Sequence, residues 1–264
     1  MSERSLRCIH GVDFSGAQNA GEKIWISSGE IESERLVIYK CRSAADEFGA
    51  RDRETVFERL REFVADRKRS VFGFDFPFGL PETVTDTTEW DEFVRTFSND
   101  FDGPDHLRET CVERAGGQKS RATEVETAAL CPYDVRIKYQ TFYGICGILN
   151  PLLRNRAASV LPMMEAETDL PWLLEVYPAA TLEQLGLERN GYKKQTVESR
   201  KRRTENADGL IKEGVDIDDE ARANAVCNDD ALDSLVAAFA TFRAVRDGPP
   251  AIDKASHPEG HIYV

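Results

Sequence analysis

The sequence predicts an α/β fold in which helices flank a mixed sheet, made of an antiparallel meander followed by parallel strands. Three strand-like segments near the N-terminus follow one another with short connections, which is typical of a meander. An amphipathic helix then leads into a short apolar strand, and such a crossover favours a buried strand parallel to its neighbour. A second apolar strand and a long C-terminal helix complete the order of a layered α/β domain.

The expected meander occupies residues 6–14, 23–28 and 34–40. Ser15 and Gly16 end its first segment, and the turn-like stretch GAQNAGE precedes the second. Because both connections are short, we expect the three strands to pair in sequence order.

The first long helix is expected within residues 51–67. Its apolar residues recur at helical spacing and form one stripe over about four turns: Val56, Leu60, Phe63 and Val64. Residues 71–74 follow as an almost wholly apolar strand, which Pro77 ends.

Residues 81–170 are interpreted as an insertion of helices and loops within a single domain that spans residues 1–264. Helical patterns occur near residues 89–97 and 138–154, and the stretch RAGGQKSRATE reads as a loop between them.

The C-terminal third again predicts strands and helices of the layered α/β domain. Residues 172–177 predict a short strand closed by a proline, and residues 192–213 predict a strongly charged helix. The next stretch, NDDALDSLVAAFATFRAV, predicts a long helix that Asn228 or Asp229 can cap. The stripe expected to pack consists of Ala231, Leu235, Ala238 and Phe242. The tail EGHIYV predicts one more extended segment.

Composition excludes several classes of protein. Of the 264 residues, 41% are hydrophobic and 31% charged, which excludes a disordered chain, a collagen-like chain and a small disulfide scaffold. No apolar run reaches the roughly 18 residues that a membrane span needs. The charged N-terminal stretch has no apolar signal core, so we expect a cytoplasmic protein. The six cysteines include no C-x-x-C pair and the four histidines are scattered, which argues against a zinc site.

The net charge of −13 sets up a field that repels nucleic acid and anionic membranes at low salt. Lysine supplies only 10 of the 34 basic residues. An acidic, lysine-poor surface suits a cytoplasm with molar salt, where the Debye length falls to about 3 Å and the long-range repulsion nearly vanishes. A halophilic protein is therefore one hypothesis, and an ordinary acidic cytosolic protein is the other.

Carboxylates stand at positions where charge is costly to bury. Asp13 and Asp75 each end an expected strand, Glu175 interrupts an apolar one, and Asp230 and Asp233 share a face of the last helix. A turn, a helix cap or a solvent-facing edge strand would account for each of them singly. If the strands are parallel, however, Asp13 and Asp75 meet at one sheet edge, and the last helix would bring its two aspartates there. Such converging acids need a divalent cation, and Mg²⁺ or Mn²⁺ suits oxygen ligands.

Five motifs occur in order along nearly the whole chain: GVDFSGA, FGFDFPFGLP, EVYPAA, NDDALDSLVAA and EGHIYV. Together they resemble domain of unknown function family 429, which is described as predicted nucleases with an RNase H-like fold. The last helix, with Asp230 and Asp233 spaced D-x-x-D and followed by Ser234 and Leu235, also resembles the final helix of RuvC-type resolvases.

The resemblance implies an RNase H-like mixed sheet and a site with two metal ions. Asp13 would be the first-strand ligand that bridges both ions, and Asp75, Asp230 and Asp233 would complete the ligand set. Resolvases carry glutamate on the later strand, where this chain has the shorter Asp75. Glu175 belongs to the EVYP motif of the family and is counted with the catalytic carboxylates.

Two basic segments are candidates for binding a substrate phosphate. Residues 193–203 carry six basic residues against one acid, and a glycine-containing loop adds three more basic residues. From these we single out Lys193 and Arg121 as phosphate contacts. A solvated helix face is the alternative reading of the basic run. The aromatic residues Tyr139, Phe142 and Tyr143 either stack on bases or belong to the core.

The sequence therefore predicts a Mg²⁺-dependent nuclease that hydrolyses phosphodiesters in DNA or RNA through a two-metal carboxylate site. Nucleic acid is the expected partner, and the oligomeric state is left open. Two other functions stay possible on the residues alone. One is a non-catalytic nucleic-acid-binding or scaffold protein of the same fold. The other is an actin-like, ATP-dependent phosphotransferase, which the hairpin-like DFSGAQNAG favours but which requires two such units.

Overall fold

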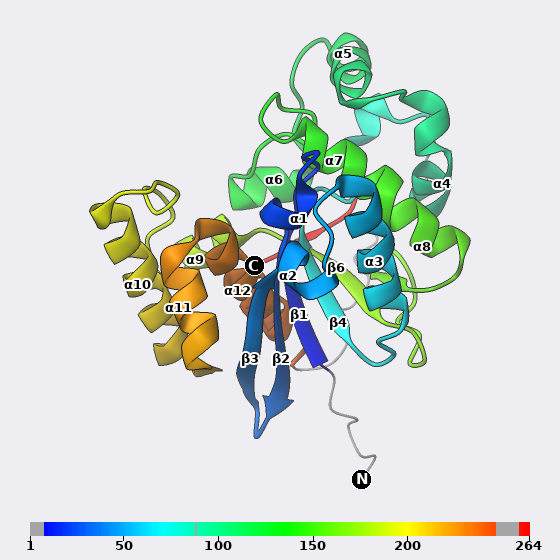
Figure 1. Cartoon of the computed structure of the whole chain (residues 1–264). Coiled ribbons are helices and arrows are strands. Elements are labelled where there is room, and N and C mark those ends of the chain that lie inside the picture. The colour runs from blue at the N-terminus through cyan, green and yellow to red at the C-terminus, as the bar shows by residue number, and fades with distance from the viewer. Residues whose placement is uncertain (1–7, 88, 247–258) are drawn as a thin grey trace.

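The computed structural model describes residues 8–87, 89–246 and 259–264. In these residues a central mixed sheet has eight strands in the order β5-β6-β4-β1-β2-β3-β7, with β8 paired to β6. Helices cover both faces of the sheet, and a group of further helices extends beyond one end of it (Figure 1). The α/β fold with a mixed sheet that the sequence predicts is thus confirmed.

The N-terminal meander consists of β1 (Cys8–Asp13), β2 (Trp25–Glu32) and β3 (Arg35–Ser43). The pairings of these three strands with one another are antiparallel, as predicted. The connection from β1 to β2 contains a one-turn helix, α1 (Ala20–Lys23), and α2 (Ala44–Phe48) follows β3 directly.

The parallel half of the sheet begins with α3 (Arg53–Ala65), which Asp52 caps by accepting a hydrogen bond from the Thr55 amide at 2.9 Å. It leads into β4 (Val71–Asp75), which pairs parallel to β1 as the helical crossover predicts. The strand β6 (Trp172–Val176) pairs parallel to β4, and the last extended segment is β8 (Ile262–Tyr263).

Two short parallel strands, β5 (Ser159–Leu161) and β7 (Val215–Ile217), extend the sheet at its two edges. The sequence analysis did not predict them, and it assigned the residues of β5 to an insertion of helices and loops. Each has only three residues, too few to show an alternating pattern, so pairing with a neighbouring strand decides their conformation.

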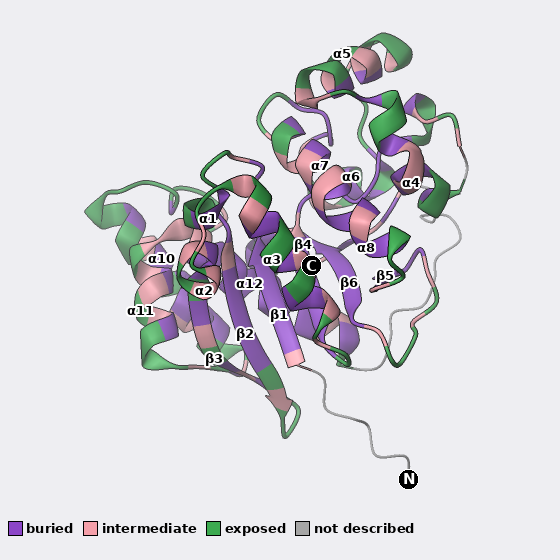
Figure 2. Ribbon diagram, turned by 45° about the vertical axis from the view of Figure 1, so that its right-hand side comes forward, coloured by how far each residue is buried: buried purple, intermediate pink, exposed green. Residues whose placement is uncertain are grey.

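Residues alternate between two cores on the two faces of the sheet. Val12 and Phe74 pack toward α3, whereas Ile9 and Leu174 pack toward the long helix α12 (Asp229–Val245). Figure 2 shows these central strands as buried along most of their length. The Asn228 side chain caps α12 by accepting from the Ala231 amide at 3.0 Å, in agreement with the sequence analysis.

The insertion packs against the same core as α3. It contains η1 (Glu82–Val84), α4 (Trp90–Asp100), α5 (Pro104–Ala115), α6 (Ala122–Thr127), α7 (Lys138–Gly144), the π-helical turn η2 (Ile145–Leu149) and α8 (Asn150–Arg154). Its buried side chains form one continuous apolar cluster with those of α3 and β4. The insertion therefore lies beyond the end of the sheet at which β1 and β4 finish (Figure 1).

Three helices accompany α12 on the other face: α9 (Pro178–Gln184), α10 (Val197–Lys212) and α11 (Asp219–Cys227). The helix expected from residue 192 begins only at Val197, because Thr196 caps it by accepting from the Ser199 amide at 3.1 Å. Residues 192–196 are therefore a loop. None of the helices in the described part of the chain is long and apolar enough to cross a bilayer.

Candidate functional site

Two neighbouring strands carry the same three-residue pattern, Gly-x-Asp, in register. Gly11 pairs with Gly73 and Asp13 with Asp75 across the parallel β1 and β4. Side chains two residues apart on a strand share a face, so all four positions face α12. A β-carbon on Gly11 would lie 2.1 Å from the Ala238 nitrogen. The glycines therefore let α12 lie directly on the sheet, and the aspartates emerge just past this contact.

The Asp13 and Asp75 carboxylates line a cavity of about 380 Å³. Asp13 is 8% exposed and Asp75 is partly buried. Within the described residues, no hydrogen bond or ion pair reaches either carboxylate. Burial, followed by the negative charges of Asp233, Asp75 and Asp230, holds the pKa of Asp13 well above its usual range. Burial also raises the pKa of Asp75 to about 7, although the ammonium of Lys193 acts in the opposite direction.

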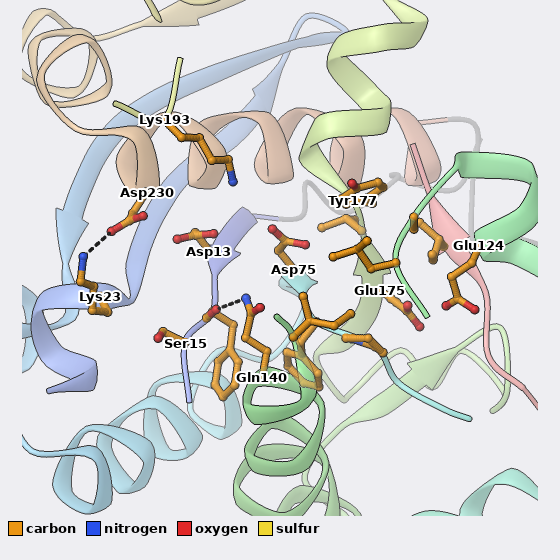
Figure 3. Close-up of a pocket in the computed structure, with 18 residues that line it drawn as sticks. Asp13, Ser15, Lys23, Asp75, Glu124, Gln140, Glu175, Tyr177, Lys193 and Asp230 are labelled. Atoms are coloured by element: carbon orange, nitrogen blue, oxygen red, sulfur yellow. Dashed lines mark hydrogen bonds and ion pairs between the residues drawn. The ribbon is translucent and has the colours of Figure 1, made fainter. Parts of the chain in front are cut away.

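Asp233 reaches the site from α12 with both carboxylate oxygens occupied. The Tyr192 hydroxyl donates to Oδ1 at 2.8 Å, and the Lys193 Nζ lies 2.6 Å from Oδ2. The Asp233 charge in turn raises the pKa of Lys193 above its usual value, so this side chain stays an ammonium. Figure 3 shows Lys193 reaching toward the gap between Asp13 and Asp75.

Asp230 lines the same cavity from the first turn of α12. Its carboxylate lies 3.7 Å from the Nζ of Lys23 at the end of α1 (Figure 3). Burial is the main cause that raises its pKa, and the neighbouring Asp229 adds to this effect. The structure thus brings together the four aspartates that the sequence analysis considered as metal ligands.

Glu175 lines the same cavity as three of these aspartates, but it is paired within the chain. It pairs with Phe74 rather than with Asp75, and it therefore faces the insertion instead of α12. Its strand has β4 on one side and β5 on the other, so the alternative of a solvent-facing edge strand is wrong. Glu175 is 2% exposed, accepts from the Phe78 amide at 2.9 Å and binds the Arg121 guanidinium. In Figure 3 it points away from Asp75 and toward Glu124.

Arg121 is fully buried at the start of α6. Its guanidinium binds both Glu124 and Glu175, and it also donates to the Glu259 carbonyl at 2.8 Å. This position corrects the expectation of a phosphate contact, because Arg121 has no exposed surface with which to meet one. The sequence could not show this, since arginine in a glycine-containing loop is usually solvated.

The rest of the basic run is also mostly engaged within the protein. Arg203 is buried and Arg202 pairs with Glu188 at 2.9 Å. The alternative of a solvated helix face therefore applies only to part of the run. Among the described residues of the run, only Lys193 lines the cavity.

The three aromatic candidates differ in their surroundings. Phe142 is buried in the core, whereas Tyr139 is 46% exposed on α7. The guanidinium carbon of Arg53 lies 3.6 Å from the ring centre of Tyr143. Of these three, Tyr139 is the most exposed, but none of them lines the cavity, which Tyr177 does.

Several residues of the site were not predicted from the sequence, and three of them make contacts that shape it. Lys23 and Gln140 line the cavity, and Tyr192 holds Asp233. The Gln140 amide donates to the Phe14 carbonyl at 2.7 Å, which ties α7 to the end of β1. The repeated Gly-x-Asp pattern was a signal for the paired aspartates, but these three residues show no comparable pattern in the sequence.

Asp13 and Asp75 are the side chains of the site that could hold a Mg²⁺ ion. Within the described residues, no group of three or more Asp, Glu, His or Cys side chains has an arrangement that could hold a metal ion. Asp13 and Asp75 nevertheless offer two unpaired carboxylates on adjacent strands. Mg²⁺ usually binds through one or two carboxylates and keeps several of its waters. The pair therefore fits one hydrated Mg²⁺ or Mn²⁺, while Asp233 is already paired within the chain.

Comparison with known proteins gives one match. A family model described as "Protein of unknown function (DUF429)" matches residues 11–257. No curated protein and no solved structure matches the chain.

Proposed function

The chain belongs to the DUF429 family, and we propose that it is a Mg²⁺-dependent nuclease, with Mn²⁺ as the alternative ion, that hydrolyses phosphodiesters of DNA or RNA. The observation that carries this proposal is the pair Asp13 and Asp75. Two carboxylates that are adjacent, largely buried and without a partner in the described part of the chain destabilise a fold unless a cation offsets their charge. Their place at the ends of parallel strands, beside a cavity, supports a site that binds a ligand.

The strand arrangement supports the RNase H-like reading of the fold. The antiparallel strands β1, β2 and β3 come first, and β4 and β6 then join parallel to β1. The resemblance to the family and to RuvC-type resolvases implies a carboxylate site with two metal ions on such a sheet.

Hydrolysis of a phosphodiester forms a bond from a water oxygen to phosphorus and breaks the bond from phosphorus to one ester oxygen. One proton of the water passes to the leaving oxygen, so the products are a phosphate monoester and an alcohol. A divalent ion would supply positive charge to the phosphate and acidify the water. Asp13 and Asp75 would hold that ion, Lys193 would contact a phosphate oxygen, and Asp230, which lines the same cavity, would orient water.

Positive side chains are present at the cavity although the net charge of the whole protein is −13. Lys23 and Lys193 line it together with five acidic side chains, so a bound phosphate would depend on these two lysines and on the divalent ion for positive charge. Exposed Tyr139 stands one residue from the cavity-lining Gln140, where a base could stack on it. In molar salt the overall repulsion would act over only about 3 Å. We place this activity in the cytoplasm, where the six free thiols would stay reduced.

The test is cleavage of end-labelled single-stranded and double-stranded DNA and RNA with Mg²⁺ or Mn²⁺, at low and high KCl. We expect Asp13→Asn and Asp75→Asn to abolish cleavage. Asp216→Asn is the matched control, because Asp216 is an exposed residue of β7 at the sheet edge that pairs with Arg35. Cleavage by both site variants at the wild-type rate contradicts the proposal. Binding without cleavage favours the non-catalytic alternative, and saturable ATP binding favours the phosphotransferase.

A further inference from the structure

The feature that distinguishes this site is a lysine placed among its aspartates. The Lys193 Nζ lies 2.6 Å from Asp233, and its electrostatic influence extends to both Asp13 and Asp75. In Figure 3 its ammonium points toward the gap between these two carboxylates. A positive charge already occupies part of the space in which converging carboxylates would otherwise hold metal ions.

The backbone on both sides of Lys193 is held in place from inside the protein. Arg203, 2% exposed, donates to the carbonyls of Tyr192 and Lys194, and its Nε donates to the Val226 carbonyl at 2.9 Å. Tyr192 is itself fully buried, and its hydroxyl is bonded to Asp233. The loop therefore holds the backbone of Lys193 in a set position, and the ion pair with Asp233 directs its side chain, which is 57% exposed, toward the site.

The aspartates divide into two kinds. Asp233 has both oxygens satisfied by Tyr192 and Lys193. Asp13 is more than nine-tenths buried and faces the cavity, yet no partner among the described residues reaches its carboxylate, and the same lack of partners applies to Asp75. A buried carboxylate without a partner needs a cation from solution, whereas a paired one does not.

We propose that the ammonium of Lys193 takes the place of a second metal ion, so that the site binds a single divalent ion at Asp13 and Asp75. This inference rests on the proposed function, because it concerns the same metal site. The positive charge of a second ion would be supplied by the chain itself, and Asp233 would serve as the anchor of Lys193 rather than as a metal ligand. A fixed ammonium beside a hydrated ion gives two positive groups that a phosphate can contact at once.

The experiment counts ions without any enzyme assay. Full-length protein, freed of metal with a chelator, is titrated with Mn²⁺ by calorimetry, and the bound ion is counted by electron paramagnetic resonance. We expect one Mn²⁺ per chain for the wild type and for Lys193→Arg, which keeps the charge. We expect Lys193→Gln to bind a second ion and to bind the first about tenfold more tightly, because the repelling charge is gone. Lys194→Gln removes the same charge one residue away and should behave as the wild type.

Asp233→Asn provides a second variant in case Lys193→Gln does not fold. If Asp233 only anchors the lysine, this variant still binds one Mn²⁺; loss of an ion from it would show Asp233 to be a ligand and would overturn the inference. Two ions in the wild type, or one ion with unchanged affinity in folded Lys193→Gln, would also overturn it. These results would leave the nuclease proposal standing, whereas a wild type that binds no Mn²⁺ refutes both.

Discussion

The substitution Asp75→Asn should stabilise the metal-free protein, and the gain should depend on pH. Burial raises the pKa of Asp75 from an ordinary value of 3.8 to about 7. A shift of that size corresponds to at most about 4 kcal/mol, at about 1.36 kcal/mol per pKa unit. Asparagine keeps the shape of the side chain but carries no charge, and it also removes a repulsion from Asp13.

The sign of the pH dependence follows from proton binding. Between pH 3.8 and about 7 the folded protein holds a proton on Asp75 that the unfolded chain has released. The wild type therefore loses stability as the pH rises through this range, and the loss is complete above about pH 7. The asparagine variant has no such loss, so its advantage at about pH 8 is roughly 2–4 kcal/mol, and its advantage at about pH 5 is less than half of that.

The measurement is urea or thermal unfolding with a chelator present, at about pH 5 and about pH 8. The expected gain at the higher pH is a rise in Tm of roughly 5–15 °C. Asp134→Asn is a control with the opposite sign, because hydrogen bonds from Arg136 hold the pKa of Asp134 below its usual range. That carboxylate stabilises the fold above its unfolded pKa, so its removal should destabilise the protein at about pH 8. An Asp75→Asn protein no more stable than the wild type at that pH, or equally stabilised at both pH values, would refute the reasoning.

Three further outcomes are expected from the packing, the buried charges and the acidic composition. Gly73→Ala places a β-carbon 1.9 Å from the Thr241 Oγ1, so urea unfolding should show a free energy of unfolding that is lower by roughly 3 kcal/mol or more. In the control Gly103→Ala the new β-carbon meets nothing within 4 Å, so the free energy of unfolding should change by less than about 1 kcal/mol. Arg121→Met leaves Glu175 buried without its cation and should cost about 3–5 kcal/mol, and an unchanged free energy of unfolding would contradict that role. If the surface is adapted to molar salt, Tm should be higher in about 3 M than in about 0.1 M KCl, and a Tm that does not rise would dismiss the halophilic hypothesis.

Local patterns determined most of the architecture. The stripe on α3, the apolar strand β4 and the capped helix α12 all appear where spacing and capping residues predict them. Such features depend on residues within a few positions of one another, so they are visible in the chain itself. The edge strands β5 and β7 were missed because three residues carry no period, and pairing with distant strands decides their conformation.

For the candidate site, too, the sequence predicted some features and tertiary contacts decided the others. The sequence by itself placed Asp13 and Asp75 at strand ends, and the parallel crossover suggested that they would meet. Their exact pairing, and the position of Glu175 on the opposite face, depend on strand register, in which one residue exchanges the two faces. The pairing of Lys193 with Asp233 depends on a loop held by buried side chains from other elements. Backbone propensity and hydrophobic period act locally and are written in the sequence, whereas the partner of a buried charge is chosen by contacts between segments far apart in the chain, which only the tertiary structure determines.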